Sequence, residues 1–155
     1  MNVVRVAPDV VRPLRQKVLR PHQTLADQVF EGDDAPGASH FAAYAGGAVI
    51  GVASITPAPY PGTGGPREGD WRVRGMATDP DGGRGLGAGA ALLAACLQYA
   101  RTSGATRVWC NARSGVRGFY EREGFAVDGD EFTLPAIGPH FLMRLDLARR
   151  RSAAP

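Results

Sequence analysis

The stretch that decides the fold is WRVRGMATDPDGGRGLGAGAALL, at residues 71–93. Its first part, residues 71–78, alternates apolar and polar side chains, which is the period of a half-buried β-strand. From Leu86 to Ala100, apolar side chains recur every three or four residues, which is the period of a buried helix. Between the two parts, four glycines alternate with other residues at 83–89. The sequence therefore predicts a strand, a glycine-rich turn and a helix.

The glycine-rich turn could bind an anion. Glycines leave backbone N–H groups unshielded, and the N-terminus of a helix carries roughly half a positive charge, which favours phosphate groups. Gly83-x-Gly85-x-x-Ala88 fits the dinucleotide-binding fingerprint. That fingerprint expects an acidic residue about 20 positions later, at the end of the next strand, whereas this strand ends at 110–113 with CNAR. Taken alone, the glycines could equally serve a tight turn and close helix packing.

The other predicted elements make one mixed α/β unit, and 155 residues are enough for a single core. Glycine and proline clusters mark the joints between elements. We expect strands at 3–7, 106–112, 125–128 and 141–147, a hairpin turning at Gly46-Gly47, and a polar loop at 30–39. We expect helices at 10–19, capped by Asp9, and at 114–123, capped by Ser114. Residues 56–70 are predicted to form a long mobile loop.

Composition excludes several classes of protein. With 44% hydrophobic and 21% charged residues, the chain is neither fibrous nor wholly disordered. Charged residues interrupt the N-terminal region, so no apolar signal-peptide core is present. The uncharged run at 35–66 is broken by prolines and glycines, and the run at 85–100 is shorter than the roughly 20 residues that span a bilayer. We therefore expect no membrane association.

Cysteine usage and charge point to a cytoplasmic protein. Cys96 and Cys110 cannot build a disulfide framework, and neither belongs to a metal-binding pattern. The net charge of +3 is carried by three arginines in the tail at 149–155, rather than by a basic stripe on a folded face. We expect neither a structural metal nor a nucleic-acid partner.

The motif Arg84-x-x-Gly87-x-Gly89 resembles the coenzyme A pyrophosphate loop of the GNAT acetyltransferase superfamily. The strand at 71–78 and the segment GFYEREGF at 118–125 resemble its flanking motifs, in the same order. The resemblance implies one α/β (α+β) domain at 1–148, followed by a flexible tail. Its sheet would be mixed and mostly antiparallel, with helices on both faces and one splayed pair of strands. Acetyl-CoA would be bound by Met76, Ala77, Thr78, Arg84, Gly85, Gly87, Ala88 and Gly89.

A closer resemblance covers most of the chain. The segments LRQKVLRPHQ, VWCNARSGVRGFYEREGF and EFTLPAIGPHFLM are similar to the glyphosate N-acetyltransferase branch of the superfamily. This similarity implies acetyl transfer from acetyl-CoA to the amine of a small anionic molecule. Transferred by motif position, the anion-binding arginines would be Arg20, Arg74 and Arg113. His140 would be the general base, and Tyr120 the acid that protonates the departing thiolate.

The residue types suit this chemistry. An amine with a pKa near 10 must lose a proton before it attacks a thioester, and an imidazole that titrates near 6.5 is a suitable base. Arginine binds carboxylate, phosphate or phosphonate bidentately. Each residue also has a plainer explanation. His140 could be a strand-end histidine and Tyr120 a core residue, while Arg20 could be a helix-end cation and Arg74 and Arg113 solvated strand residues.

Two other functions stay open at this point. A non-catalytic acyl-CoA sensor would keep the glycine turn without turnover, and a peptide or protein N-acetyltransferase would use the same cofactor on a different acceptor. His140 and Tyr120 speak against the sensor, and the arginines speak against a cationic peptide. The sequence leaves open whether the protein is a monomer or a homodimer.

Overall fold

The computed structural model describes residues 1–83 and 85–147, so Arg84 and the predicted tail lie outside it. Within these residues, eight strands form one sheet in the order β1-β2-β3-β4-β5-β8-β6, with β7 also paired to β8. The pair β4–β5 is parallel and the others are antiparallel. The strands are β1 (Asn2–Val6), β2 (Ser39–Ala45), β3 (Ala48–Pro57), β4 (Asp70–Thr78), β5 (Arg107–Arg113), β6 (Ala126–Val127), β7 (Phe132–Leu134) and β8 (Gly138–Asp146).

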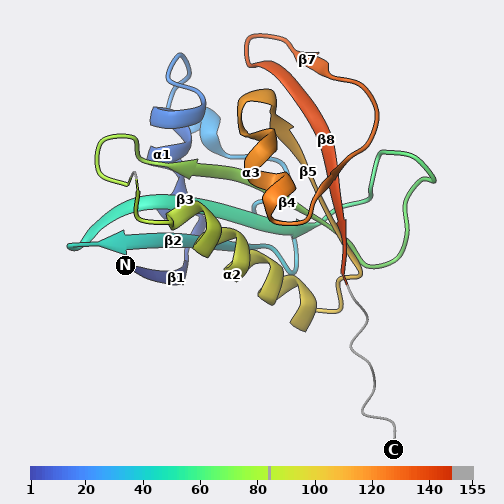
Figure 1. Cartoon of the computed structure of the whole chain (residues 1–155). Helices are drawn as coiled ribbons and strands as arrows, with labels where there is room; N and C mark the ends of the chain where they lie inside the picture. The colour runs from blue at the N-terminus through green and yellow to red at the C-terminus, as the bar shows by residue number, and fades with distance from the viewer. Residues whose placement is uncertain (84, 148–155) are drawn as a thin grey trace, which may run out of the picture.

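Helices cover both faces of this sheet, as predicted. The helix α2 (Ala88–Thr102) packs Leu92 and Leu93 on one face, and Figure 1 shows it crossing the near side of β2 and β3. The helix α1 (Pro8–Leu14) packs against the other face and forms a second apolar cluster. The remaining helical segments are η1 (Arg15–Leu19), η2 (Ala26–Gln28), η3 (Ser114–Val116) and α3 (Arg117–Arg122). In the part of the chain that the structure describes, every helix is too short or too polar to cross a membrane.

The strands β4 and β5 separate along their length. They are paired where Asp70–Arg72 meets Arg107–Trp109. In the described residues the ladder ends there, although β4 continues to Thr78 and β5 to Arg113. The predicted splayed pair is therefore confirmed, and it leaves a gap in the sheet whose closed end is at Arg72 and Trp109.

A β-bulge bends β4 beside this gap. Ser54 on β3 is opposite Arg74, and Val52 is opposite Ala77, so two residues of β4 face the single residue between them. One of the two is Gly75, whose φ of 65° lies in the left-handed region. A Cβ at Gly75 would lie 2.8 Å from Nε of the buried Arg15. Glycine is therefore required at the bulge both by the backbone and by the close approach of Arg15.

Both predicted helix caps are wrong. The helix α1 begins at Pro8, its N-cap is Ala7, and no side chain caps it, so Asp9 lies inside the first turn. Proline starts the helix earlier because its fixed φ already suits the first helical position. Ser114 begins the 3-10 turn η3, and its hydroxyl donates to Glu131 at 2.8 Å. The Ser114 hydroxyl thus contacts a distant segment, and no side chain of the described residues caps η3.

The loop between β3 and β4 is irregular as predicted, and its side chains and backbone make hydrogen bonds to other segments. Asp128 accepts hydrogen bonds from the hydroxyl of Tyr60, and from the backbone N–H and the hydroxyl of Thr63 at 2.8 and 2.7 Å. Trp109 Nε1 donates to the carbonyl of Ala58 at 3.0 Å. Burial and the bond to Asp128 raise the pKa of Tyr60 to about 12, so its hydroxyl stays protonated as donor. These contacts attach the loop to β5 and to the segment after β6.

A buried ion pair joins this loop to the sheet. Arg107, which has no exposed surface, donates from Nε and Nη2 to Asp70 at 2.7 and 3.0 Å. Asp70 also accepts the backbone N–H groups of Tyr60 and Arg67 at 3.1 and 2.7 Å. Burial alone would raise the pKa of Asp70, but these hydrogen bonds outweigh it and lower the pKa. The carboxylate therefore stays charged and satisfied inside the protein.

Replacing Asp70 by alanine is expected to lower the free energy of unfolding by about 3–5 kcal/mol, because it leaves the Arg107 charge buried without a partner. Urea denaturation followed by circular dichroism measures the change. Asp146→Ala is the matched control, since that carboxylate is 61% exposed and lies 3.8 Å from Arg67. Its loss is expected to cost less than about 1 kcal/mol. Equal effects of the two substitutions would show that the buried pair is not a principal support of the fold.

Candidate active site

A cavity of about 540 Å³ opens where β4 and β5 separate. Its walls come from η1, β4, the start of α2, β5, α3 and β8, so residues far apart in the chain meet there. Most of the residues predicted from the sequence line it, namely Arg20, Arg74, Met76, Ala77, Thr78, Gly89, Arg113, Tyr120 and His140. The structure thus brings the predicted base, acid and anion-binding groups to one place.

The cofactor side of the cavity is built mainly from backbone. After Arg72, the edge of β4 that faces β5 has no strand partner among the described residues, so its peptide groups are available to a ligand. Gly85 and Gly87 have positive φ values of 78° and 71° and open space around them, just before α2 begins. Ala88, the first residue of α2, is buried. An open β-edge that leads to unshielded N–H groups at a helix N-terminus fits the pantetheine arm and pyrophosphate of coenzyme A.

His140 is held in a defined tautomer. It lies on β8, opposite Arg113 on β5 and Phe132 on β7, and its ring stacks on Phe132 with centroids 5.9 Å apart. Its Nδ1 lies 2.7 Å from the carbonyl oxygen of Gly138. A carbonyl oxygen can only accept, so in the neutral imidazole Nδ1 carries the proton and Nε2 has the free lone pair. Nε2 is therefore the nitrogen that can take a proton from a substrate.

Tyr120 is a buried phenol at the cavity wall. It lies on α3, and its ring makes edge-to-face contacts with Phe119 and Phe125 at 5.1 and 5.4 Å. It is 5% exposed, and burial raises the pKa of its hydroxyl well above the usual value. The hydroxyl is therefore protonated at neutral pH and can act as a proton donor. Tyr120 therefore both packs in the core and lines the cavity.

The three predicted arginines all line the cavity. Arg113 donates to the carbonyl of Leu19, which links β5 to η1. The guanidinium groups of Arg20 and Arg74 each lie 4.6 Å from the centre of the Phe30 ring. Among the described residues, no carboxylate lies within 4.0 Å of these three groups. The cavity therefore contains positive charge that the protein does not neutralise at close range.

The pKa values of these arginines reflect that crowding. Burial, together with the charges of Arg72 and Arg20, lowers the pKa of Arg74 to about 10. Burial also lowers the pKa of Arg20, and the charges of Arg113 and Arg15 add to the effect. A bound anion would relieve both the desolvation and the mutual repulsion. The site is thus electrostatically suited to an anionic ligand.

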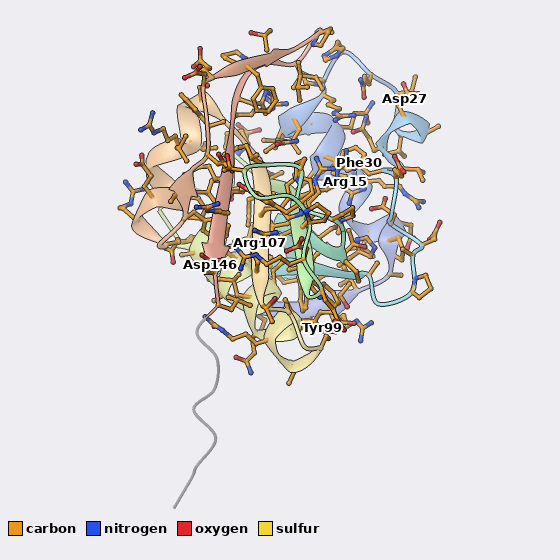
Figure 2. The ribbon with its side chains drawn as sticks, turned by 90° about the vertical axis from the view of Figure 1, so that its right-hand side faces the viewer. Arg15, Asp27, Phe30, Tyr99, Arg107 and Asp146 are labelled. Carbon is orange, nitrogen blue, oxygen red and sulfur yellow. The ribbon has the colours of Figure 1, made fainter. Side chains whose placement is uncertain are left out.

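Phe30 organises the site, although the sequence places it in a polar loop. It is 7% exposed, and its ring faces Arg15 at 4.0 Å as well as Arg20 and Arg74. Figure 2 shows Arg15 and Phe30 side by side. The one signal in the sequence is a lone aromatic residue at the start of an otherwise polar stretch. Arg72 and Asn111 are further cavity residues that the sequence analysis does not single out.

Arg15 forms the rigid support beneath Phe30. It has no exposed surface and donates to both carboxylate oxygens of Asp33, at 2.7 and 3.0 Å, and to Ser54 Oγ at 2.9 Å. Ser54 also lies 2.6 Å from Nδ1 of the buried His40. Burial alone would raise the pKa of Asp33, but the bond to Arg15 and other interactions lower it. This network, which the sequence leaves without a role, fixes the ring on which two anion-binding arginines rest.

The cavity also contains a cysteine that is unsuited to covalent catalysis. Cys110 lines the wall but is 2% exposed, and burial raises the pKa of its thiol to about 12. The reactive thiolate is therefore scarce at neutral pH. Within residues 1–83 and 85–147, no group of three His, Cys, Asp or Glu side chains could hold a metal ion.

Comparison with known proteins agrees with this geometry. The model of the Acetyltransferase (GNAT) family matches residues 9–125. The uncharacterized N-acetyltransferase YitI of Bacillus subtilis (strain 168) is 32% identical over 97% of this chain and 99% of its own length.

Solved structures share the fold. A putative N-acetyltransferase from Lactobacillus plantarum superposes with a TM-score of 0.74 at 21% identity, over 95% of this chain and 98% of its own. An aminoglycoside 6'-N-acetyltransferase complexed with coenzyme A superposes with a TM-score of 0.75 at 12% identity, over 98% and 100%. With the open strand edge, the glycine turn and the family match together, the chain belongs to the GNAT family of acetyltransferases.

Proposed function

We propose that this protein transfers the acetyl group of acetyl-CoA to the amine of a small anionic acceptor that resembles an amino acid. The observation that carries the proposal is the cluster of Arg20, Arg74 and Arg113 in the same cavity as His140 and Tyr120. These arginines have no carboxylate within 4.0 Å in the described part of the chain, so an acceptor with a carboxylate, phosphate or phosphonate would supply the missing charge. The resemblance of the chain to glyphosate N-acetyltransferases supports the same acceptor class.

His140 prepares the acceptor for attack. At neutral pH the acceptor nitrogen is mostly ammonium, and Nε2 of His140 accepts its proton while Nδ1 donates to Gly138. That contact fixes the ring, so Nε2 needs no reorientation before proton transfer. A positioned base of this kind contributes about 10²–10⁴ in rate.

Tyr120 completes the proton balance. Acetyl-CoA, when bound, supplies an activated thioester, and the amine nitrogen bonds to the acetyl carbon as the bond from that carbon to sulfur breaks. The protonated Tyr120 donates to the departing sulfur. The nitrogen loses its second proton to solvent as the amide forms, and solvent returns a proton to Tyr120. Burial keeps the thiols of Cys96 and Cys110 protonated, with pKa values raised to about 12, which favours direct transfer over an acetyl-cysteine intermediate.

Two alternatives are disfavoured by the same site. A sensor of acyl-CoA would not need a base of defined tautomer in the same cavity as a protonated phenol. A peptide N-acetyltransferase that selects basic peptides would bring cations toward uncompensated arginines. A panel of anionic and cationic acceptors distinguishes the three functions directly.

The first test is release of coenzyme A from acetyl-CoA, followed by chromatography so that the protein thiols do not interfere. Amino acids of both hands, aminophosphonates and glyphosate form the anionic set, and polyamines and lysine peptides the cationic set. We expect turnover within the anionic set. Turnover confined to cationic amines would contradict the anion-binding role of the arginines, and acetyl-CoA binding without turnover of any amine would favour the sensor.

His140→Ala is expected to lower kcat by about 10²–10⁴ with little change in coenzyme A affinity, because the base acts on the acceptor. The loss should shrink at high pH, where the amine deprotonates in solution. Steady-state kinetics and calorimetry measure the two quantities. His22→Ala is the control, since His22 is exposed and does not line the cavity. A parallel loss of coenzyme A binding would remove His140 from the role of base.

Arg113→Gln is expected to raise the KM of an anionic acceptor about 10- to 150-fold, since a charge-assisted hydrogen bond contributes about 1.5–3 kcal/mol. Arg122→Gln removes an equal charge from the exposed end of α3 and should leave that KM unchanged. Thermal melts of both variants check that the fold is intact, because Arg113 also contacts Leu19. An unchanged KM in a folded Arg113→Gln protein would exclude Arg113 from acceptor binding.

A further inference from the structure

Arg72 lies at the closed end of the cavity. It is two residues from Arg74 on β4, so the two side chains lie on the same face of the sheet. It is opposite Trp109 in the last paired position between β4 and β5, whereas Arg113 lies four residues further along β5. At about 3.3 Å per residue, this places Arg113 about 13 Å further along the strand than Trp109. The cavity therefore has an arginine at its closed end and another toward its open end.

The guanidinium of Arg72 is poorly satisfied by the protein. Its carbon lies 4.8 Å from the centre of the Trp109 ring, and its Nε is buried with no hydrogen-bond partner in the described part of the chain. In those residues no carboxylate lies within 4.0 Å of it. Trp109 is itself fixed, because its Nε1 donates to Ala58. The guanidinium of Arg72 is thus stacked on the Trp109 ring, and its Nε–H is free to donate a hydrogen bond to a ligand.

The surroundings of Arg72 destabilise its charged form. Burial lowers the pKa of this arginine, and repulsion from Arg20 lowers it further, against opposing contributions from Cys110 and Glu31. In turn, the charge of Arg72 lowers the pKa of Arg74. A second anion at the closed end of the cavity would relieve this desolvation and repulsion, because it could accept a hydrogen bond from the buried Nε of Arg72, which has no partner among the described residues.

We propose that Arg72 binds a second anionic group of the acceptor and so selects dianionic over monoanionic amines. This inference rests on the proposed acetyl transfer to an anionic amine. One anionic group of the acceptor would lie among Arg20, Arg74 and Arg113, and the other would reach Arg72 at the closed end. The acceptor class is then an amino acid whose side chain carries a carboxylate or a phosphate.

The competing explanation is structural, in which Arg72 only stacks on Trp109. The two explanations differ in what they predict for matched substrates. If Arg72 binds a second anionic group, its removal raises the KM of glutamate and aspartate much more than that of glutamine and asparagine, which have nearly the same shape. If Arg72 only supports Trp109, its removal lowers the melting temperature and affects charged and neutral acceptors alike.

The kinetic test compares these two pairs of acceptors, in both enantiomers, for the wild type, Arg72→Gln, Arg72→Lys and Arg144→Gln. Arg144 is the matched control, because it is opposite Trp109 on β8 but does not line the cavity. In Arg72→Gln we expect the KM of the dianionic acceptors to rise about 10- to 150-fold while that of the amides changes less than about threefold. Arg72→Lys should recover part of the loss, and Arg144→Gln should resemble the wild type. Equal changes for acids and amides would overturn the proposal.

A binding test separates this inference from the proposed function. Succinate and butyrate have no amine and cannot be acetylated, so calorimetry with saturating coenzyme A reports anion binding alone. We expect succinate to bind more tightly than butyrate, and Arg72→Gln to remove the difference. If this holds while no anionic amine is acetylated, the acetyl transfer fails and the second anion site stands. If anionic amines are acetylated but succinate binds no better than butyrate, the proposed function stands and Arg72 has no such role.

Discussion

The separation of β4 from β5 is the constraint on which the site depends. A parallel pair that stayed in register would close the sheet and remove the cavity, but here the ladder ends at Arg72 and Trp109. The bulge at Gly75 bends β4 away, while β5 keeps its register with β8 along its whole length. Arg15, held by Asp33, packs directly under the bulge. A buried ion pair near the N-terminus thus supports the opening in the middle of the sheet.

The arginines divide into two groups by what neutralises them. Arg15 and Arg107 are fully buried, and each is paired with a buried aspartate, so both serve the fold. The cavity arginines have no such carboxylate in the described residues and are held by other means. Arg20 and Arg74 stack on Phe30, and Arg113 donates to a carbonyl. Aromatic and carbonyl contacts fix a guanidinium without neutralising it, which leaves its charge for a ligand.

The local features could be predicted from the sequence. The strand at 71–78, the glycine turn and the following helix depend on periodicity, and the cavity residues Arg20, Arg74, Arg113, Tyr120 and His140 came from motif resemblance. Features that depend on distant partners could not be predicted. Phe30 is buried because three arginines from other segments meet its ring, and the 58–69 loop is attached to the segment after β6 by hydrogen bonds to Asp128. Arg72 looks like an ordinary solvated strand residue until the register with Trp109 is known.

The strand β4 contributes both backbone groups and side chains to the site. In the proposed reaction its backbone contacts the cofactor, whereas its outward side chains, Arg72 and Arg74, meet the acceptor. Peptide groups are the same whichever side chains they carry. Substitutions at these two positions can therefore change which amine is recognised without disturbing the cofactor. In this arrangement, recognition of the amine depends on exchangeable side chains, whereas recognition of the acetyl donor depends on main-chain groups that every residue type supplies.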